Sequence, residues 1–383
     1  MAGRLIITPV ETQAERNVFI HFAWKVYQDD PYWVPPLLSE QQELLTTHPF
    51  HEHATVRYFL ARREGEVVGR IAAFINYGHN KHWDEQVGFF GLFEVLDDQE
   101  AANKLLETAE EFVRAEGMTA IRGPMNFSTN EECGLLVEGW NGPPVIMLTY
   151  NPRYYVNFIE DAGYVKAMDL LAYIVDLTKY QPDGTGINPK LLRVAERVKQ
   201  RYNIKVRPID MRNFDEEAKL IKEVYNAAWS QNWGFVPFTD AEMDHLAMGL
   251  KQLLDPETIF IAEKEGEAIA FILPFPDLNQ PLLRAYPRPG VPEWWTMLKL
   301  FYWWKVRRSV TSIRGAVGGV KAQYRGRGVD AVLFLTSLLA SLRRGYTQSE
   351  ISWVLETNTP MRQTAENVGG EVYRTYRVYE KKL

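Results

Sequence analysis

Cysteine is nearly absent from this sequence, since Cys133 is the single thiol in 383 residues. A lone cysteine excludes an intrachain disulfide and by itself makes no metal site. The seven histidines show no ligand spacing either, because His48, His51 and His53 lie in a loop without cysteine or carboxylate at fitting intervals. We therefore expect a protein with no metal and no structural disulfide, in a reducing, cytoplasmic setting.

Long apolar runs are also missing. The first ten residues lack the apolar core of a signal peptide, and no run reaches the roughly 18 apolar residues that a membrane-spanning helix needs. The net charge of −6 argues against a general nucleic-acid binder, so no nucleic acid is expected among the partners. Hydrophobic residues make up 46% of the chain, which is ample for the cores of two domains.

The two halves of the sequence repeat the same order of short motifs. Trp33-Val-Pro recurs as Phe235-Val-Pro, and the hairpin pattern that begins at Phe59 recurs at Phe260, so the offsets are 202 and 201 residues. Both hairpin patterns have a Glu-Gly turn between strand-like residues. A nearly constant offset at separate places indicates two copies of one domain.

The two copies are joined by Thr178–Gly186, a segment rich in glycine with one proline. A third match, between Asn151-Pro and Asn358-Thr-Pro, supports the same division of the chain. The repeat therefore predicts one domain over residues 1–178 and a second over residues 186–383.

The second copy has a basic loop with two glycines between a short strand and a helix over residues 329–344. Free backbone N–H groups at a helix N-terminus, together with the partial positive charge of the helix dipole, suit a pyrophosphate. The corresponding stretch of the first copy, residues 94–101, is acidic and lacks glycine, so a phosphate would be repelled there. We therefore expect the ligand site in the second copy, and a degenerate first copy that supports it or forms part of an acceptor pocket.

Two nucleotide-binding patterns fit the loop. Gly326-x-Gly328-x-x-Ala331 matches the loose dinucleotide fingerprint, but too little chain follows it to build a dinucleotide fold. Gln323-x-x-Gly326-x-Gly328 also matches the loop by which GNAT (Gcn5-related N-acetyltransferase) enzymes hold coenzyme A. A strand ending in Asn358, a short helix and a last strand follow the loop, and this order resembles the C-terminal half of the GNAT fold.

The resemblance implies an α/β (α+β) fold of two tandem GNAT-like domains, each a mixed, mostly antiparallel sheet flanked by helices. It also implies acyl-CoA or acetyl-CoA as co-substrate, with backbone amides of the strand before the loop polarising the thioester carbonyl. The residues that it places on coenzyme A are Gly318, Gly319, Val320, Gln323, Tyr324, Arg325, Gly326, Arg327, Gly328, Val329 and Asn358.

Longer stretches resemble one subgroup of tandem GNAT proteins, which includes the bacterial ceramide synthases. These stretches are residues 88–94, 123–139 and 226–237. The resemblance implies an acyl-CoA-dependent N-acyltransferase whose acceptor is a small-molecule or lipid primary amine, such as a sphingoid-type amine. Acetyl transfer to a small polar amine and a non-catalytic acyl-CoA sensor stay open as alternatives. The acceptor-binding residues that it implies are Asn126, Asn130, Asn232 and Trp233.

Acyl transfer to an amine also needs groups that handle protons. The candidate catalytic carboxylates are Glu356, at the end of a strand pattern, and Glu94, inside an aromatic strand of the first copy, although each could instead be structural. Many GNAT enzymes have a proton-donating tyrosine about seven residues after the asparagine, but that position is Ala365 here. The sequence therefore leaves the general acid unassigned.

The segment Pro292–Arg308 combines aromatic and apolar residues with four basic ones. This composition is typical of a helix that lies in a membrane interface, and it indicates peripheral contact with the inner face of a membrane. Two other interpretations stay open, namely a channel for an acyl chain and a buried helix or dimer contact. The sequence does not define the oligomeric state.

Overall fold

The computed structural model describes residues 3–383, which divide into two compact units. Neither unit is one continuous segment of the chain. The boundaries 1–178 and 186–383, drawn from the repeat, stay a prediction. Unit 1 comprises the chain up to Leu170 with 279–307 and 374–383, and unit 2 comprises 171–278 and 308–373.

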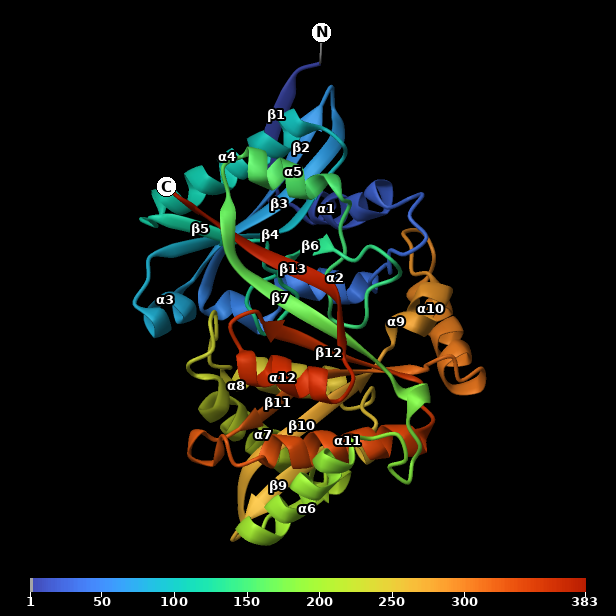
Figure 1. Ribbon diagram of the computed structural model, residues 1–383. Coiled ribbons are helices and arrows are strands. Elements are labelled where there is room, and N and C mark those ends of the chain that lie inside the picture. The colour runs from blue at the N-terminus through green and yellow to red at the C-terminus, as the bar shows by residue number, and fades with distance from the viewer. Residues whose placement is uncertain (1–2) are drawn as a thin grey trace. The chain divides into compact units, whose positions relative to one another are not determined.

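The sheet of unit 1 has the strand order β1-β2-β3-β4-β5-β13, with β6 also paired to β13 (Figure 1). Neighbouring strands are antiparallel except β4 and β5, which are parallel. The strands are β1 (Leu5–Pro9), β2 (Ala54–Arg63), β3 (Glu66–Asn76), β4 (Val87–Val95), β5 (Ala120–Gly123), β6 (Leu135–Glu138) and β13 (Glu371–Lys382), the last of which begins in unit 2.

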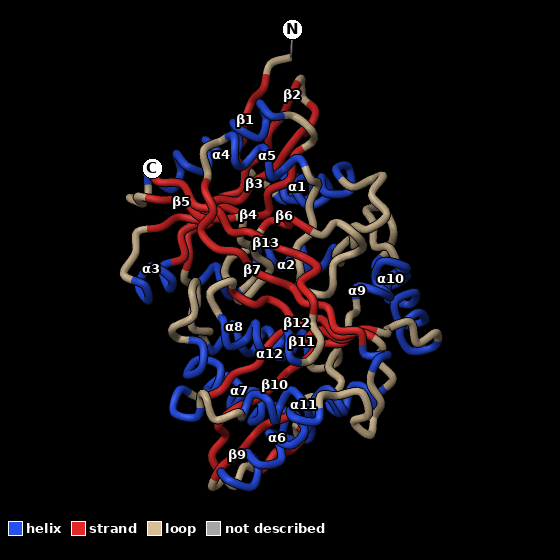
Figure 2. The backbone as a smooth tube through the Cα atoms, viewed as in Figure 1, coloured by secondary structure: helices blue, strands red, loops and turns tan. Residues whose placement is uncertain are grey.

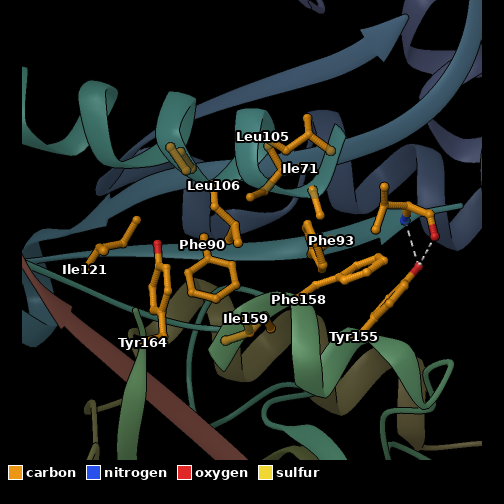
Figure 3. Close-up of a cluster of buried hydrophobic side chains, with 14 of the residues drawn as sticks. Ile71, Phe90, Phe93, Leu105, Leu106, Ile121, Tyr155, Phe158, Ile159 and Tyr164 are labelled. Carbon is orange, nitrogen blue, oxygen red and sulfur yellow. Dashed lines mark hydrogen bonds between the residues drawn. The ribbon is translucent and has the colours of Figure 1, made fainter. Parts of the chain in front are cut away.

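Helices cover both faces of this sheet. On one face, apolar residues of α4 and α5 pack on β3 and β4 around Phe90 and Phe93, and Figure 3 shows these side chains meeting. On the other face, α1 and α2 pack on the same strands around Phe19 and Leu60. The helices of unit 1 are α1 (Gln13–Val26), α2 (Leu38–Thr46), α3 (Tyr77–Trp83), α4 (Gln99–Ala115), α5 (Tyr154–Asp161), α9 (Asn279–Ala285) and α10 (Glu293–Phe301), with a π turn at Tyr302–Val306.

Unit 2 has the strand order β7-β12-β11-β10-β9-β8 (Figure 2). Its strands β11 and β12 are parallel. The pairs β10–β11, β9–β10 and β8–β9 are antiparallel, as are their counterparts in unit 1. The strands are β7 (Val165–Asp176), which begins in unit 1, β8 (Lys205–Pro208), β9 (Phe260–Lys264), β10 (Glu267–Pro276), β11 (Ser312–Val320) and β12 (Gln348–Leu355).

Helices α6 and α11 pack together on one face of the unit 2 sheet, over Ile269 and Ile272 of β10. Helix α7 contacts β10 and β11. No helix within residues 3–383 is long and apolar enough to cross a membrane. The helices of unit 2 are α6 (Pro189–Tyr202), α7 (Phe214–Trp229), α8 (Asp240–Leu250), α11 (Val329–Arg344) and α12 (Thr359–Asn367).

The repeat predicted from sequence is visible in the hairpins of the two units. The β2–β3 turn has Glu64 at φ 51° and Gly65 at φ 89°, and the β9–β10 turn has Glu265 at φ 54° and Gly266 at φ 85°. Two units with the same strand order and the same turn geometry confirm the tandem fold. The end of β7, from the first half of the chain, completes unit 2, and the end of β13 completes unit 1.

Candidate functional site

Strand β11 leaves its parallel neighbour part-way along its length. Its pairing with β12 runs as far as Gly315 and Ile351 and, among the described residues, ends there. Its other edge stays paired with β10 as far as Val320. The segment Val317–Val320 therefore has one edge with no strand partner in the described chain, where backbone N–H groups can meet an extended ligand.

The divergent end of β11 runs directly into the glycine loop. A 3₁₀ turn at Ala322–Tyr324 is followed by Arg325, Gly326 and Arg327, all exposed, and α11 begins at Val329. No side chain caps this end of the 16-residue helix. Gly328 is half-buried and Val329 is buried, so the exposed part of this helix end is the loop Arg325–Arg327 that leads into it. The uncapped amides and the partial positive charge of a helix N-terminus are the groups that bind phosphate.

Glycine is needed at the two loop positions for different physical reasons. Gly326 has φ 68°, and a Cβ added there would meet nothing within 4 Å, so its backbone is open to a ligand. Gly328 has φ 81°, and a Cβ there would lie 3.0 Å from Val198 of α6. The first glycine therefore leaves space above the loop, and the second lets α6 approach the start of α11.

The basic residues near the loop divide into structural and exposed ones. Lys321 is buried, and its Nζ lies 2.7 Å from Glu223 and 2.8 Å from Glu267. Burial alone would lower the pKa of Lys321, but the two carboxylates outweigh it and the pKa is raised. Arg325 and Arg327 remain exposed at the loop, so they are the cations that can reach an anionic ligand.

Aromatic rings hold one of these arginines in place. The guanidinium of Arg327 lies 5.6 Å from the ring centroid of Tyr202 and 5.5 Å from that of Tyr324. Arg325 donates to the backbone carbonyl of Val320 at 3.3 Å and to that of Ala228. Both side chains are thus oriented by protein contacts before any ligand arrives.

Asn358 and Glu356 lie at the other strand of the divergent pair. The Asn358 side chain caps α12 by accepting from the N–H of Met361 at 3.2 Å. Glu356 is half-buried, and its backbone carbonyl accepts a hydrogen bond from the Arg362 side chain at 3.1 Å. In the structure, Asn358 fixes the turn from β12 into α12, and its role on coenzyme A stays a prediction.

A buried charged cluster that the sequence analysis missed lies where β11 and β12 part. Arg314 and Glu350 are register partners, and both are almost fully buried. Ser352 Oγ accepts from Arg314 Nε at 2.9 Å and lies 2.7 Å from Glu350 Oε1, and the hydroxyl of Tyr373 donates to Glu350 Oε2. The sequence signal that could have revealed this cluster is a charged residue, Arg314 or Glu350, inside each of two apolar strand patterns.

The corresponding opening beside β4 in unit 1 is filled by protein. The N–H of Met125 donates to the carbonyl of Phe90 at 2.8 Å, and Oδ1 of Asn126 accepts from the N–H of Leu92 at 3.0 Å. Asn126, an expected acceptor residue, therefore satisfies the backbone of β4 in the structure. No extended ligand can occupy the same backbone groups.

The helix that follows β4 is also closed to anions. The carboxylate of Asp98 caps α4 by accepting from the N–H of Ala101 at 3.1 Å. Arg63 forms a salt bridge with the same carboxylate at 2.9 Å. A phosphate would have to displace a bound negative charge, which agrees with the expectation from the acidic sequence 94–101.

Glu94 lies at the end of β4 in a network of hydroxyl groups. Its carboxylate accepts from Tyr27 at 2.9 Å and Tyr155 at 2.8 Å, and it lies 3.9 Å from the guanidinium of Arg70. Its side chain is 14% exposed. Burial raises the pKa of Glu94, and Arg70 and the two hydroxyls only partly offset this. Glu94 is thus held rigidly in unit 1, and its catalytic role stays a prediction.

The remaining expected acceptor residues fall in both units. Asn130 lies in a turn of unit 1, where its N–H donates to Ser128 Oγ at 3.1 Å. Asn232 and Trp233 follow α7 in unit 2, and the indole of Trp229 donates to the carbonyl of Gly318 at 2.9 Å. Asn232 donates its N–H to the carbonyl of Trp229, so this turn lies beside the divergent end of β11. No group of three metal-ligating side chains occurs within residues 3–383.

Comparisons with known proteins give a consistent result. The chain is 39% identical over 389 residues to the bacterial ceramide synthase of Caulobacter vibrioides. The match covers 99% of this chain and 98% of that protein. It is 33% identical over 374 residues to protein YghO of Escherichia coli, with 96% and 93% covered. No model of a known protein family matches it.

Solved structures show the same fold at low sequence identity. A tandem GNAT protein from the clavulanic acid biosynthesis pathway, solved without acetyl-CoA, matches with a TM-score of 0.57 at 14% identity. That match covers 99% of this chain and 98% of the other. A GCN5-related N-acetyltransferase from Sphaerobacter thermophilus matches with a TM-score of 0.52 at 14% identity, covering 99% and 95%.

Proposed function

Because the chain belongs to the tandem GNAT superfamily and is an acyltransferase, we propose that it moves an acyl group from coenzyme A to the primary amine of a long-chain lipid acceptor. The observation that carries this proposal is the divergence of β11 from β12 after Gly315, which leads directly into an exposed glycine loop. A strand edge without a strand partner and a basic glycine loop at its end suit the two parts of coenzyme A, the extended pantetheine arm and the pyrophosphate.

The residues present fit this ligand. The amides of Gly326 and Arg327 and the N-terminus of α11 would hold the pyrophosphate, with the side chains of Arg325 and Arg327 beside it. The backbone N–H groups of Val317–Val320, at the edge that has no strand partner, would hold the pantetheine arm beside Trp229 and Arg325, which bond the carbonyls of Gly318 and Val320. One of these amides would polarise the thioester carbonyl. The acyl-CoA supplies an activated carbonyl; the chain orients it and handles the protons.

Transfer requires that the amine nitrogen bonds to the thioester carbon and loses a proton, and that the C–S bond breaks with a proton going to the leaving thiolate. We assign the first proton to the carboxylate of Glu350 as acceptor and the second to the hydroxyl of Tyr373 as donor, because this pair lies in the same unit, at the point where the strands part. This assignment replaces the missing tyrosine at position 365, where Ala365 is fully buried. Glu356, half-buried beyond the end of β12, is the second candidate in this unit.

The choice of a lipid amine is supported by the similarity to a protein named bacterial ceramide synthase over nearly the whole chain. An apolar cavity of about 30 Å³ also lies under the last β11–β12 pair, lined by Ile313, Ile351, Phe334 and Leu338. This volume has room for a few atoms only. A longer chain that extends from the thioester into the core would have to widen the cavity by moving the side chains that line it.

The experiment is a thiol-release assay with two acyl donors, acetyl-CoA and palmitoyl-CoA, and two acceptor classes, long-chain amino alcohols and short polar amines. We expect amine-dependent thiol release with palmitoyl-CoA and the long-chain acceptor. Thiol release only with acetyl-CoA and short polar amines would contradict the proposal and support acetyl transfer to a small polar amine. Coenzyme A binding without release under any combination would indicate a sensor.

A further inference from the structure

The strongest feature that the proposed function does not use is the surface of α10 and the π turn that follows it. Of the residues of α10, only Thr296 is buried. Large apolar side chains with exposed fractions of 45% to 64% cover this segment, namely Trp294, Trp295, Met297, Leu298, Phe301 and Val306. So dense a group of exposed apolar residues marks an interaction surface.

The segment is firmly attached at its N-terminal end. Glu293 accepts hydrogen bonds from the N–H and hydroxyl of Ser39 at 2.9 and 2.5 Å. Just before the helix, the carbonyl of Pro287 accepts from the indole of Trp24 at 2.9 Å. Figure 1 shows α9 and α10 side by side, in agreement with their contacts. The apolar surface therefore belongs to a held helix and not to a loose tail.

The charges of this region differ in sign from those of the whole chain. Residues 279–307 contain five basic residues and one acidic residue, Glu293, whereas the protein has a net charge of −6. The acid is engaged with Ser39, and three of the cations stack on the indoles. The Nζ of Lys305 lies 3.4 Å from the ring of Trp304, and Arg284 and Arg307 lie 4.8 and 6.0 Å from the ring of Trp303.

We propose that α10 and the following π turn, Glu293–Val306, bind peripherally to an anionic lipid bilayer. The exposed apolar side chains would enter the boundary between headgroups and acyl chains, and Lys299, Lys305 and Arg307 would meet lipid phosphates. Tryptophan and tyrosine favour this depth because their rings are apolar and carry one polar atom. The protein would then reach its lipid acceptor by surface contact.

A second copy of the chain is a less suitable occupant. In a two-fold symmetric dimer each residue of the patch meets the same patch of the partner, so the cations interleaved with the tryptophans would face like charges. Like charges brought together at an interface weaken it. An anionic bilayer offers the opposite charge and an apolar layer together.

The test is co-sedimentation of the full chain with vesicles of phosphatidylglycerol and phosphatidylcholine, and with vesicles of phosphatidylcholine alone. We expect binding to the anionic vesicles and a reduction of roughly tenfold or more in the double variant Leu298→Ser, Phe301→Ser. The variant Lys305→Glu, Arg307→Glu should lose the preference for anionic vesicles. The matched control is Tyr77→Ser with Met248→Ser, two exposed residues outside the segment, and it should bind as the wild type does.

Absence of wild-type binding to anionic vesicles would overturn the proposal, and so would equal binding by the double variant. A dimer in size-exclusion chromatography that the double variant dissociates, without vesicle binding, would assign the surface to a second copy instead. Thermal stabilisation by coenzyme A, measured without vesicles, should be the same in the double variant and the wild type. If coenzyme A does not stabilise the wild type, that result contradicts the proposed function and leaves the proposal for this surface unaffected.

Discussion

The hydroxyl of Tyr155 lies 2.8 Å from the carboxylate of Glu94, and the same carboxylate has a buried cation, Arg70, 3.9 Å away. Glu94→Gln leaves the Arg70 guanidinium buried without a counter-charge, so we expect a loss of about 3 kcal/mol in the free energy of unfolding. Arg70→Met combined with Glu94→Gln should cost less than the sum of the two single changes. Urea unfolding at neutral pH measures all three.

Tyr155→Phe is the control for this pair, because it removes one hydrogen bond and keeps both charges. We expect it to cost about 1 to 2 kcal/mol. Additive costs for the two charge changes would show that Glu94 and Arg70 do not stabilise each other.

Glu40 should make the stability of the protein depend on pH. Its pKa is raised to about 6 by partial desolvation and by the like charges of Glu293 and Glu43 nearby. Because the residue is exposed at the surface, solvent screening keeps the effect on stability small. The folded state therefore holds a proton that the unfolded state, with a pKa of about 4.3, has lost, so stability falls as the pH rises through this window. Glu40→Gln should raise the melting temperature at pH 8 and leave it unchanged at pH 4. The same increase at both pH values would contradict the assignment.

Tyr373→Phe should lower kcat by roughly a hundredfold and leave the KM for acyl-CoA unchanged, if the Tyr373–Glu350 pair handles the proton. Tyr346→Phe is the matched control, because Tyr346 donates to the carboxylate of Asp255 at 2.9 Å in the same unit. Steady-state thiol release measures both, after thermal melting has shown that each variant is folded. Equal kcat values for the two variants would contradict this role and would assign the proton transfer to Glu356 or to water instead.

Leu338 should influence the length of the acyl chain. It lines the apolar cavity under the last β11–β12 pair, whereas Leu339, next to it on α11, does not. Leu338→Ala enlarges the cavity and should shift the preference towards longer acyl-CoA donors. Leu339→Ala is the control and should keep the wild-type preference, as judged from kcat/KM over a series of donors. A shift of the same size in both variants would show that the cavity does not receive the chain.

Much of the fold could be predicted from the sequence because local signals were strong. The Glu-Gly turns at Gly65 and Gly266 confirm the repeat, and α11 spans residues 329–344, as the sequence pattern predicted. Gly326 is exposed, and its role on a ligand stays a prediction. These features depend on neighbouring residues, so a short stretch of sequence suffices to define them.

Features that depend on distant residues could not be predicted. The side chain of Asn126 bonds to Leu92, 34 residues away, and the Arg314–Ser352 contact spans 38 residues. The last residues of β13 pair with β5, in the first half of the chain, although the repeat alone assigns this strand to the second copy. Periodicity shows that a residue is in a strand, but not which strand lies beside it.

Calorimetric titration with coenzyme A tests the central claim most directly. We predict one site per chain, because Asp98 closes the corresponding helix in unit 1, and loss of binding in Gly326→Asp. Gly266→Asp is matched to it, since Gly266 also has a positive φ and an added Cβ that meets nothing within 4 Å, and it should bind as the wild type does. Two sites per chain, or unchanged binding in Gly326→Asp, would contradict a coenzyme site at the N-terminus of α11.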